Sequence, residues 1–387
     1  MSRTTRHRPE LTLGWDHVAA WRLRRHHLDA RQPRRRALDV VAEIGGLHAQ
    51  VMSSAELTLW ARVDDLEPDA VRRALWEERS LVKTWAMRGT LHLLPGAELP
   101  LWRAALSTRG GYFRPVWLRN FGVTHQELER LIDAVAEALD GRMLTREELA
   151  GEVARLTGSP ELGEKVRGSW GALLKPAAQH GQLCFAPSDG QRVRFTRPDR
   201  WLGQWREHDP DSAVLEVARR FLAASGPVTR EDYARWWGVE APAGGQVLAR
   251  LGDEVVPVEV DGTDAWLLAV HAEEIAGAAG PAEAPPVRLL SAFDQYVVTA
   301  SRHADHLLPG PFKDRVYRPQ GWLSPVLLVD GRMWGVWRHE VKGRKVRVSI
   351  EPFVKLPAST RRAAEGEAER LAAHLDGTLD LTWAAPT

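Results

Sequence analysis

Two segments, LTREELAGEVARL (residues 144–156) and VTREDYARWWGV (residues 228–239), open with the same Thr-Arg-Glu motif and continue with an amphipathic pattern. Thr145 and Glu148 have the spacing of a capping box, in which two side chains satisfy unpaired backbone N–H groups at the start of a helix. The second segment has aspartate in place of this glutamate, which is a weaker form of the same signal. The motif therefore predicts two helices that begin at equivalent points of two similar modules.

The flanks of both segments repeat as well. A helical pattern precedes each of them, at 126–139 and 213–224, and a further helical stretch follows each. Two extended runs then surround an Asp-Gly pair, at 183–196 and 255–270, and Asp-Gly is a strong signal for a hairpin turn. Three helices followed by a hairpin is the order of a winged helix, so we predict one such unit in each region.

The N-terminal region fits this order more loosely. Helical patterns at 18–28, 37–44 and 54–63 precede a fourth helical stretch, and the extended run at 81–94 contains a glycine turn. We therefore predict a third winged-helix unit, placed first in the chain.

The C-terminal region has a different pattern. The small, proline-rich run at 276–286 predicts a linker. Short β-type runs with glycine turns follow it, at 287–301, 322–340 and 344–353, and an amphipathic helix at 359–375 closes the chain. We therefore predict an α+β fold: three tandem winged-helix units, then a small β-barrel or sheet module and a C-terminal helix. The predicted domains are 1–120, 121–210, 211–280 and 287–387.

The composition is ordinary for a globular protein, with 44% hydrophobic and 27% charged residues in 387. The chain has no run of about 18 apolar residues, and its N-terminus lacks the apolar core of a secretory signal. We therefore expect a cytoplasmic protein that does not contact membranes. The single cysteine, Cys184, excludes an intramolecular disulfide and any all-cysteine metal cluster.

The stretch GGLHAQVMSS (residues 45–54) separates two predicted helices. Its two glycines are a natural helix stop, and Ser53 with Glu56 has the spacing of a capping box for the next helix. The residues between form a short extended bridge, in which alternate side chains point the same way. His48 and Gln50 are therefore expected on one face. Taken alone, the pair is better explained by backbone hydrogen bonds that tie a helix junction together.

Three blocks occur in order along the chain: GLHAQ…AELTLWAR, TWAMRGTLHLLP and LLSAFDQYVV…SR. Together they resemble the AlkZ/YcaQ-type winged-helix DNA glycosylases, from about residue 18 to residue 353. The resemblance implies three tandem winged helices and a β-barrel wrapped around DNA, and hydrolysis of the N-glycosidic bond of alkylated bases. Some members of the family also unhook interstrand crosslinks.

The family's catalytic motif is a Gln-x-Gln or Gln-x-Asp bridge, and the matching residues here are His48-Ala49-Gln50. The histidine looks like the His-x-Gln subset linked to self-resistance in producers of DNA-alkylating antibiotics. An N7-alkylguanine is cationic and leaves readily, so the enzyme must only place a water near C1′ and stabilise an oxocarbenium-like sugar.

An imidazole with an ordinary pKa of about 6.5 can act as a base near neutrality, and an amide cannot. General-base assistance is typically worth about 10²–10⁴ in rate. We therefore expect His48 to activate the water and Gln50 to orient the water and the sugar, with the opposite emphasis as the alternative. No lysine stands near the bridge, which argues against Schiff-base chemistry.

Two clusters of basic residues suit a phosphate backbone. GRMWGVWRHEVKGRKVRV (residues 331–348) predicts a hairpin with its tip at Lys342-Gly343-Arg344, and residues 1–36 hold ten arginines, including the run 34–36. Both clusters are also compatible with a solvated surface. The expected DNA contacts are Arg338, Lys342, Arg344, Lys345 and Arg347 on the hairpin, and Arg88, which alternates with apolar residues and His92 on a predicted wing strand.

The sequence predicts no cofactor and no metal site, because the cluster RHADH (residues 302–306) lacks a spaced third block of ligands. The expected partner is double-stranded DNA that contains alkylated guanine, bound by a monomer associated with the nucleoid. Two other functions stay open: a non-enzymatic winged-helix regulator that binds DNA, and an array that binds proteins. The near-zero net charge of +1 mildly favours the last.

Overall fold

The computed structural model describes residues 11–277 and 285–385 of the 387. The first ten residues, with Arg3, Arg6 and Arg8 of the predicted N-terminal cluster, and most of the predicted linker lie outside the described residues. The chain divides into two compact units. Unit 1 contains residues 1–70, 218–236 and 240–387, and unit 2 contains residues 71–217 and 237–239. No helix in the described ranges is long and apolar enough to cross a membrane.

Unit 2 contains the winged-helix module predicted at 121–210. Its helices are α7 (His125–Ala138), α8 (Arg146–Thr157) and α9 (Pro160–Gly168), and its hairpin is β6 (Cys184–Asp189) with β7 (Arg192–Thr196). The capping box at the start of α8 is confirmed, because the Thr145 hydroxyl accepts from the Glu148 N–H and the Glu148 carboxylate accepts from the Thr145 N–H. The short β5 (Leu144–Thr145) pairs with β7.

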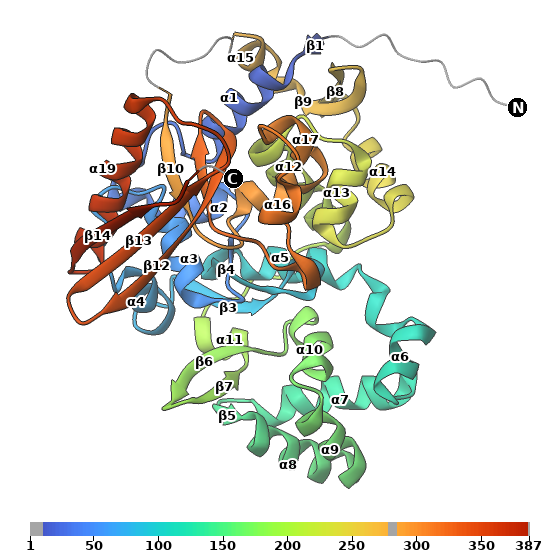
Figure 1. Cartoon of the computed structure of the whole chain (residues 1–387). Coiled ribbons are helices and arrows are strands. Elements are labelled where there is room, and N and C mark those ends of the chain that lie inside the picture. Colours follow the sequence, from blue (N-terminus) through green and yellow to red (C-terminus); the bar gives the residue numbers. More distant parts are fainter. Residues whose placement is uncertain (1–10, 278–284, 386–387) are drawn as a thin grey trace, which may run out of the picture. The chain divides into compact units, whose positions relative to one another are not determined.

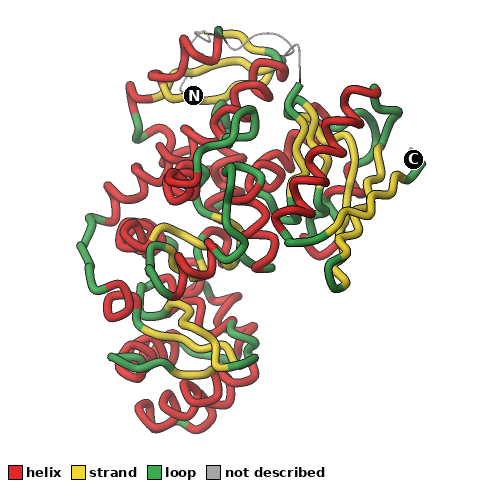
Figure 2. The backbone as a smooth tube through the Cα atoms, turned by 90° about the vertical axis from the view of Figure 1, so that its left-hand side faces the viewer, coloured by secondary structure: helices red, strands yellow, loops and turns green. Residues whose placement is uncertain are grey.

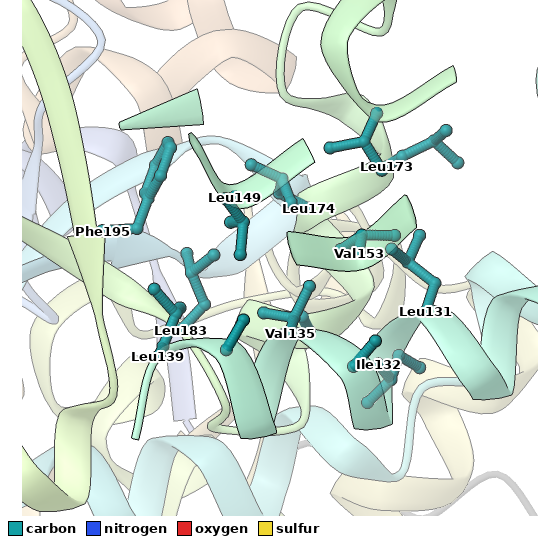
Figure 3. Close-up of a cluster of buried hydrophobic side chains, with 14 of the residues drawn as sticks. Leu131, Ile132, Val135, Leu139, Leu149, Val153, Leu173, Leu174, Leu183 and Phe195 are labelled. Atoms are coloured by element: carbon teal, nitrogen blue, oxygen red, sulfur yellow. The ribbon is translucent and has the colours of Figure 1, made fainter. Parts of the chain in front are cut away.

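Apolar side chains of these elements form the core shown in Figure 3. The leucines and valines that face inward from α7 and α8, such as Val135 and Val153, are completely buried together with Leu174 and Leu183. The unit also contains β3 and β4, an antiparallel pair, and several short helices. Their bounds are β3 (Leu81–Trp85), β4 (Leu91–Pro95), α4 (Ala70–Trp76), α5 (Leu99–Ser107), α6 (Pro115–Phe121), α10 (Lys175–Gln179) and α11 (Pro198–Leu202).

Unit 1 contains the other helices of the predicted tandem. They are α1 (Trp15–Arg25), α2 (Ala37–Glu43), α3 (Met52–Trp60), the C-terminal half of α12 (Pro210–Ser225), α13 (Arg230–Trp237) and α14 (Ala241–Ala249). The hairpin of β8 (Val255–Val260) and β9 (Thr263–Leu268) turns at Asp261-Gly262 as predicted, and β1 (Leu11–Leu13) pairs with β8. The short helix α15 (Ala272–Ala276) follows.

Of the two predicted forms of the C-terminal region, a small β-barrel or a sheet, the structure shows the sheet: the strands in the described ranges form an open sheet in the order β10-β11-β12-β13-β14, and they do not close into a barrel. Its strands are β10 (Val287–Leu290), β11 (Val326–Val329), β12 (Arg332–Lys342), β13 (Lys345–Pro352) and β14 (Thr378–Trp383). The helix α19 (Ala358–His374) packs against β10 and β14, and Figures 1 and 2 show it lying along the sheet.

Two further predictions for this region are wrong. The run after β10 was expected to continue as strand, but α16 (Gln295–Ala300) begins there because the Asp294 carboxylate caps it, accepting from the Tyr296 N–H at 2.9 Å. The chain was expected to close with α19, but β14 follows and pairs in parallel with β13. The remaining short helices are α17 (Ala304–Leu307) and α18 (Lys313–Val316).

Candidate functional site

The candidate catalytic bridge begins where α2 ends. Gly45 and Gly46 both have positive φ, and their N–H groups donate to the carbonyls of Ala42 and Val41 at 3.1 and 2.8 Å. These two bonds form the glycine C-cap of a Schellman motif, so the predicted helix stop is confirmed. The chain then becomes extended in β2 (Leu47–His48) and enters α3 at Met52. The predicted Ser53 cap is wrong, because the helix begins two residues earlier, at Met52, with Val51 as its N-cap.

Along the bridge the side chains alternate only in part. Leu47 and Ala49 are completely buried, as expected for the inward face of an extended segment. Gln50 is exposed, but the side chain of His48 is only 5% exposed. The predicted pair is therefore divided between a buried imidazole and an exposed amide, because an aromatic ring from a distant segment covers the histidine.

That ring is Phe293. It lies parallel to the His48 imidazole, with 4.9 Å between ring centroids and an interplanar angle of 9°. On another side, Phe293 contacts the ring of Trp322 in an edge-on arrangement at 5.0 Å. Three rings thus run in sequence from the exposed Trp322 to the buried histidine.

Phe293 belongs to the loop between β10 and α16. The hydroxyls of Ser291, in this loop, and of Thr58, in α3, both lie 2.8 Å from the backbone oxygen of Ser54 and 2.9 Å from each other. The side-chain amide of Gln295 donates to the backbone oxygen of Gly46 at 2.8 Å. The loop therefore contacts the chain on both sides of the bridge.

A buried ion pair fixes the centre of the loop. Both guanidinium NH₂ groups of Arg62 donate to the carboxylate of Asp294, each at 2.7 Å, and both side chains are completely buried. Arg62 also donates to the backbone oxygen of Thr58 at 2.8 Å. A buried ion pair is tolerated when its remaining donors and acceptors are satisfied, as they largely are here. Sequence reasoning gave neither residue a role, although AFDQY was part of the quoted resemblance.

The bridge carries one imidazole and one carboxamide. Among residues 11–277 and 285–385 there is no group of three or more histidine, cysteine, aspartate or glutamate side chains that could hold a metal ion. His303 of the RHADH cluster instead lies 2.9 Å from the Asp232 carboxylate. An imidazole and a carboxamide can both hold a water by hydrogen bonds, and an imidazole can also accept a proton from it.

The basic hairpin is present as predicted, with Gly343 in the turn between β12 and β13, and Figure 1 shows the two strands side by side. The side chains of Lys342 and Arg344 are 78% and 85% exposed. Their distances to carboxylates, 3.9 Å to Glu340 and 3.8 Å to Asp376, correspond to weak surface pairs.

Away from the tip of the hairpin, carboxylates of other elements partly neutralise the basic side chains. Asp380 of β14 lies 3.1 Å from Lys345 and 2.9 Å from Arg347, and its pKa is lowered by the hydrogen bonds from these two cations. Arg332, counted in the basic stretch, pairs with Asp16 at 2.6 Å. The sequence reading missed these acidic partners because they come from other elements. The tip is therefore the strongest candidate for a phosphate contact.

The other expected contacts are less suited to DNA. In unit 2, Arg88 lies in the turn between β3 and β4, with a left-handed φ of 55°, and His92 on β4 is completely buried, so the predicted alternation along a wing strand is wrong for both. In the N-terminal cluster, Arg34 pairs with Glu67, and Arg36 contacts Asp39 at 3.3 Å.

The comparisons with known proteins agree with one another. A family model described as DNA glycosylase AlkZ-like matches residues 41–374, a range that includes the bridge, the loop at Phe293 and the hairpin. The interstrand DNA cross-link repair glycosylase of Streptomyces sahachiroi is 36% identical over 364 residues, which cover 92% of this chain and 95% of that protein. The solved structure of the DNA glycosylase AlkZ from the same organism matches with a TM-score of 0.86 at 35% identity, over 97% of this chain and 100% of the other.

Proposed function

This chain belongs to the AlkZ-like DNA glycosylase family, and from that membership we propose that it hydrolyses the N-glycosidic bond of N7-alkylguanine in double-stranded DNA. The substrate class follows from the chemistry of the bridge. An amide and an imidazole supply no strong acid for a neutral leaving group, whereas a cationic N7-alkylguanine leaves without being protonated. Water attack at C1′ is then the step that the protein has to promote.

In the proposed mechanism the exposed Gln50 meets the DNA. Its amide holds the attacking water and directs its carbonyl dipole toward the positive charge that develops on the sugar. His48 accepts the proton from this water at a ring nitrogen, whose lone pair lies in the plane of the imidazole and therefore at its edge, while Phe293 covers one face of the ring. Gln50 follows His48 by two residues on the same bridge, so one water can lie within reach of both groups.

The hairpin tip supports the DNA-binding part of the proposal. Lys342 and Arg344 extend from the end of β12 and β13, are largely exposed, and make only weak ion pairs. Such cations gain from phosphate contacts, since each neutralised phosphate of duplex DNA releases counterions. We assign the tip and, less directly, Arg338, Lys345 and Arg347 to the phosphate backbone. The proposal also includes the three tandem winged-helix units and the four domains predicted from the sequence. One monomer is proposed to bind one duplex.

The relative from S. sahachiroi bears the name of an interstrand cross-link repair glycosylase. We propose that this chain likewise acts on bulky adducts, of the kind left by a DNA-alkylating antibiotic, and so serves self-resistance through base excision. The half-exposed Trp322 supports a bulky substrate, because its ring offers a flat apolar surface next to Phe293.

The observation that carries the proposal is the exposed Gln50, two residues after His48 on the bridge, within a chain of this family. The test is incubation with duplexes that carry N7-methylguanine or a larger N7-alkylguanine, followed by hot alkali to break the strand at abasic sites. Strand breaks at the adduct, absent in the His48→Ala/Gln50→Ala variant, are expected. Tight binding with no breaks on any adduct would favour the regulator instead.

A further inference from the structure

We propose that Phe293 is a positioning residue that sets the plane of the His48 imidazole, and that the buried Arg62–Asp294 pair holds it in place. The inference rests on the proposed role of His48 and extends it to a loop almost 250 residues away in the sequence. It assigns a function to the Ser-Ala-Phe-Asp-Gln segment that neither the bridge nor the hairpin requires.

The need for such a residue follows from the torsions of histidine. The χ2 torsion of an imidazole is broad, so the rotamer of the side chain leaves the orientation of the ring largely undetermined. A ring stacked at 4.9 Å and 9° removes this freedom, because rotation about χ2 would turn the imidazole into the face of Phe293. The stack covers a face of the imidazole and not the edge that carries its nitrogens.

The backbone at Phe293 is held in an unusual conformation. Its φ is +60°, in the left-handed region that bulky residues rarely adopt. Such conformations persist where the surroundings over-determine them. Here the next residue, Asp294, is fixed by two 2.7 Å bonds from Arg62 and by its cap on α16. The loop therefore presents the phenylalanine ring in one direction.

The same loop is fastened to the bridge on both sides. Gln295 donates to the Gly46 oxygen, two residues before His48, and Ser291 lies against the Ser54 oxygen, six residues after it. The phenylalanine and the histidine thus move together with one hydrogen-bonded frame. Trp322 contacts the ring of Phe293 from another side at 77°, which limits tilting of that ring away from the imidazole.

Chemistry explains why this matters. A base that accepts a proton from water must direct its nitrogen lone pair at that water, and a misplacement of about 1 Å can cost about 10²-fold in rate. DNA binding does not depend on the angle of the ring. Loss of Phe293 is therefore expected to lower the single-turnover rate and to leave DNA affinity unchanged.

The experiment compares Phe293→Leu, which removes the flat ring and keeps an apolar side chain, with Phe293→Tyr, which keeps the ring. The matched control is Phe312→Leu, because Phe312 stacks on Phe353 at 4.5 Å and 5° in the same unit without contacting His48. Single-turnover cleavage of an N7-methylguanine duplex should fall about 10- to 100-fold in Phe293→Leu. It should stay near wild type in Phe293→Tyr and Phe312→Leu, with DNA affinity unchanged throughout.

A double-mutant cycle separates this inference from the function it rests on. If Phe293 acts through His48, Phe293→Leu should add no loss to His48→Ala, since the group that it positions is gone. Additive losses would overturn the inference while leaving the glycosylase proposal intact. Full activity of His48→Ala would instead remove the role proposed for the histidine.

Two further measurements keep the test decisive if Phe293→Leu folds poorly. On the N7-methylguanine duplex, which has no bulky group for Trp322 to contact, Trp322→Ala alters only the exposed end of the stack. It should lower the rate in the same direction, again without effect in the His48→Ala background. In spectra of the protein labelled with ¹³C-histidine, the His48 resonance, identified by its loss in His48→Ala, should show a ring-current shift that Phe293→Tyr retains. An unshifted resonance in the wild-type protein would contradict the stacking on which the inference depends.

Discussion

The side-chain amide of Gln295 donates a hydrogen bond of 2.8 Å to the backbone oxygen of Gly46, across a sequence separation of 249 residues. Gly46 is the second glycine of the helix stop that begins the bridge, so this bond fixes the point at which the chain becomes extended. The segment that follows β10 therefore takes part in shaping the candidate catalytic bridge, and a substitution of Gln295 should affect catalysis although this residue is assigned no contact with DNA.

The roles proposed for His48 and Gln50 can be tested separately by single substitutions. Gln50→Ala removes the exposed amide and should lower the single-turnover rate by about 10²–10³, the range found for removal of one group that stabilises developing charge. Gln50→Glu, which keeps the carbonyl-type acceptor and loses the NH₂ donor, should retain more activity than alanine. Equal rates for alanine and wild type would exclude Gln50 from the reaction.

The Arg62–Asp294 pair should be a major determinant of stability. Asp294→Ala leaves a completely buried guanidinium without its partner, and breaking such a pair costs about 3–5 kcal/mol. Urea denaturation should show this loss. The double variant Arg62→Met/Asp294→Ala should lose less than the two single variants together, because neither buried charge is then left alone. A loss below about 1 kcal/mol in Asp294→Ala would show that the pair is not closed in solution.

The hairpin tip should set the salt dependence of DNA binding. In Lys342→Ala/Arg344→Ala/Lys345→Ala, affinity should fall for all duplex sequences, and the slope of log K against log salt should flatten by up to about 0.9 for each lost phosphate contact. Of the three substitutions, Lys345→Ala should change this slope least, because Lys345 already pairs with Asp380.

A matched control for this charge change is Arg146→Ala/Arg155→Ala/Arg167→Ala, which removes three partly or largely exposed cations from helices of unit 2. The same flattening in both triple variants would mean that overall charge, and not the hairpin, determines the slope.

Acid stability should depend on Asp232. Burial alone would raise the pKa of this carboxyl, but the hydrogen bond and charge of His303 and the N–H of Thr229 outweigh it and lower the pKa to about 2. A carboxyl whose pKa is lower in the folded state stabilises the protein above its unfolded pKa of 3.8, and this contribution is lost as the pH falls from about 4 to about 2.

The lost contribution corresponds to about 2 kcal/mol at 1.36 kcal/mol per pKa unit. Asp232→Asn keeps the oxygen that accepts from Thr229 and cannot titrate, so its free energy of unfolding should vary less with pH over this window. Parallel pH profiles for the two proteins would show that the carboxyl is not stabilised by its neighbours.

Local signals in the sequence predicted local structure well. Thr145 with Glu148 marked the start of α8, Asp261 with Gly262 marked a hairpin turn, and the glycines at 45 and 46 marked the end of α2. Each of these depends on backbone groups within a few residues, which a sequence pattern can show. The family was confirmed as well, because its motifs extend over most of the chain.

What the sequence could not show depends on segments that meet only in the fold. His48 was expected beside Gln50 on one face, but Phe293 covers it. The hairpin was counted as almost purely basic, but Asp380 comes alongside it on β14. The helix α16 was read as strand because its β-branched residues obscured the cap at Asp294. In each case a long-range contact overrides what the local residues favour.

The parallel pairing of β14 with β13 has a consequence for handling the protein. Without β14, the eight-residue β13 would present unsatisfied backbone groups along an open border, which is a template for association between molecules. The edge of the sheet is instead β14, which carries Asp380, and a charged side chain on an edge strand discourages pairing with the sheet of another molecule. A tag or truncation that disturbs residues 378–383 should therefore lead to self-association before it affects base excision.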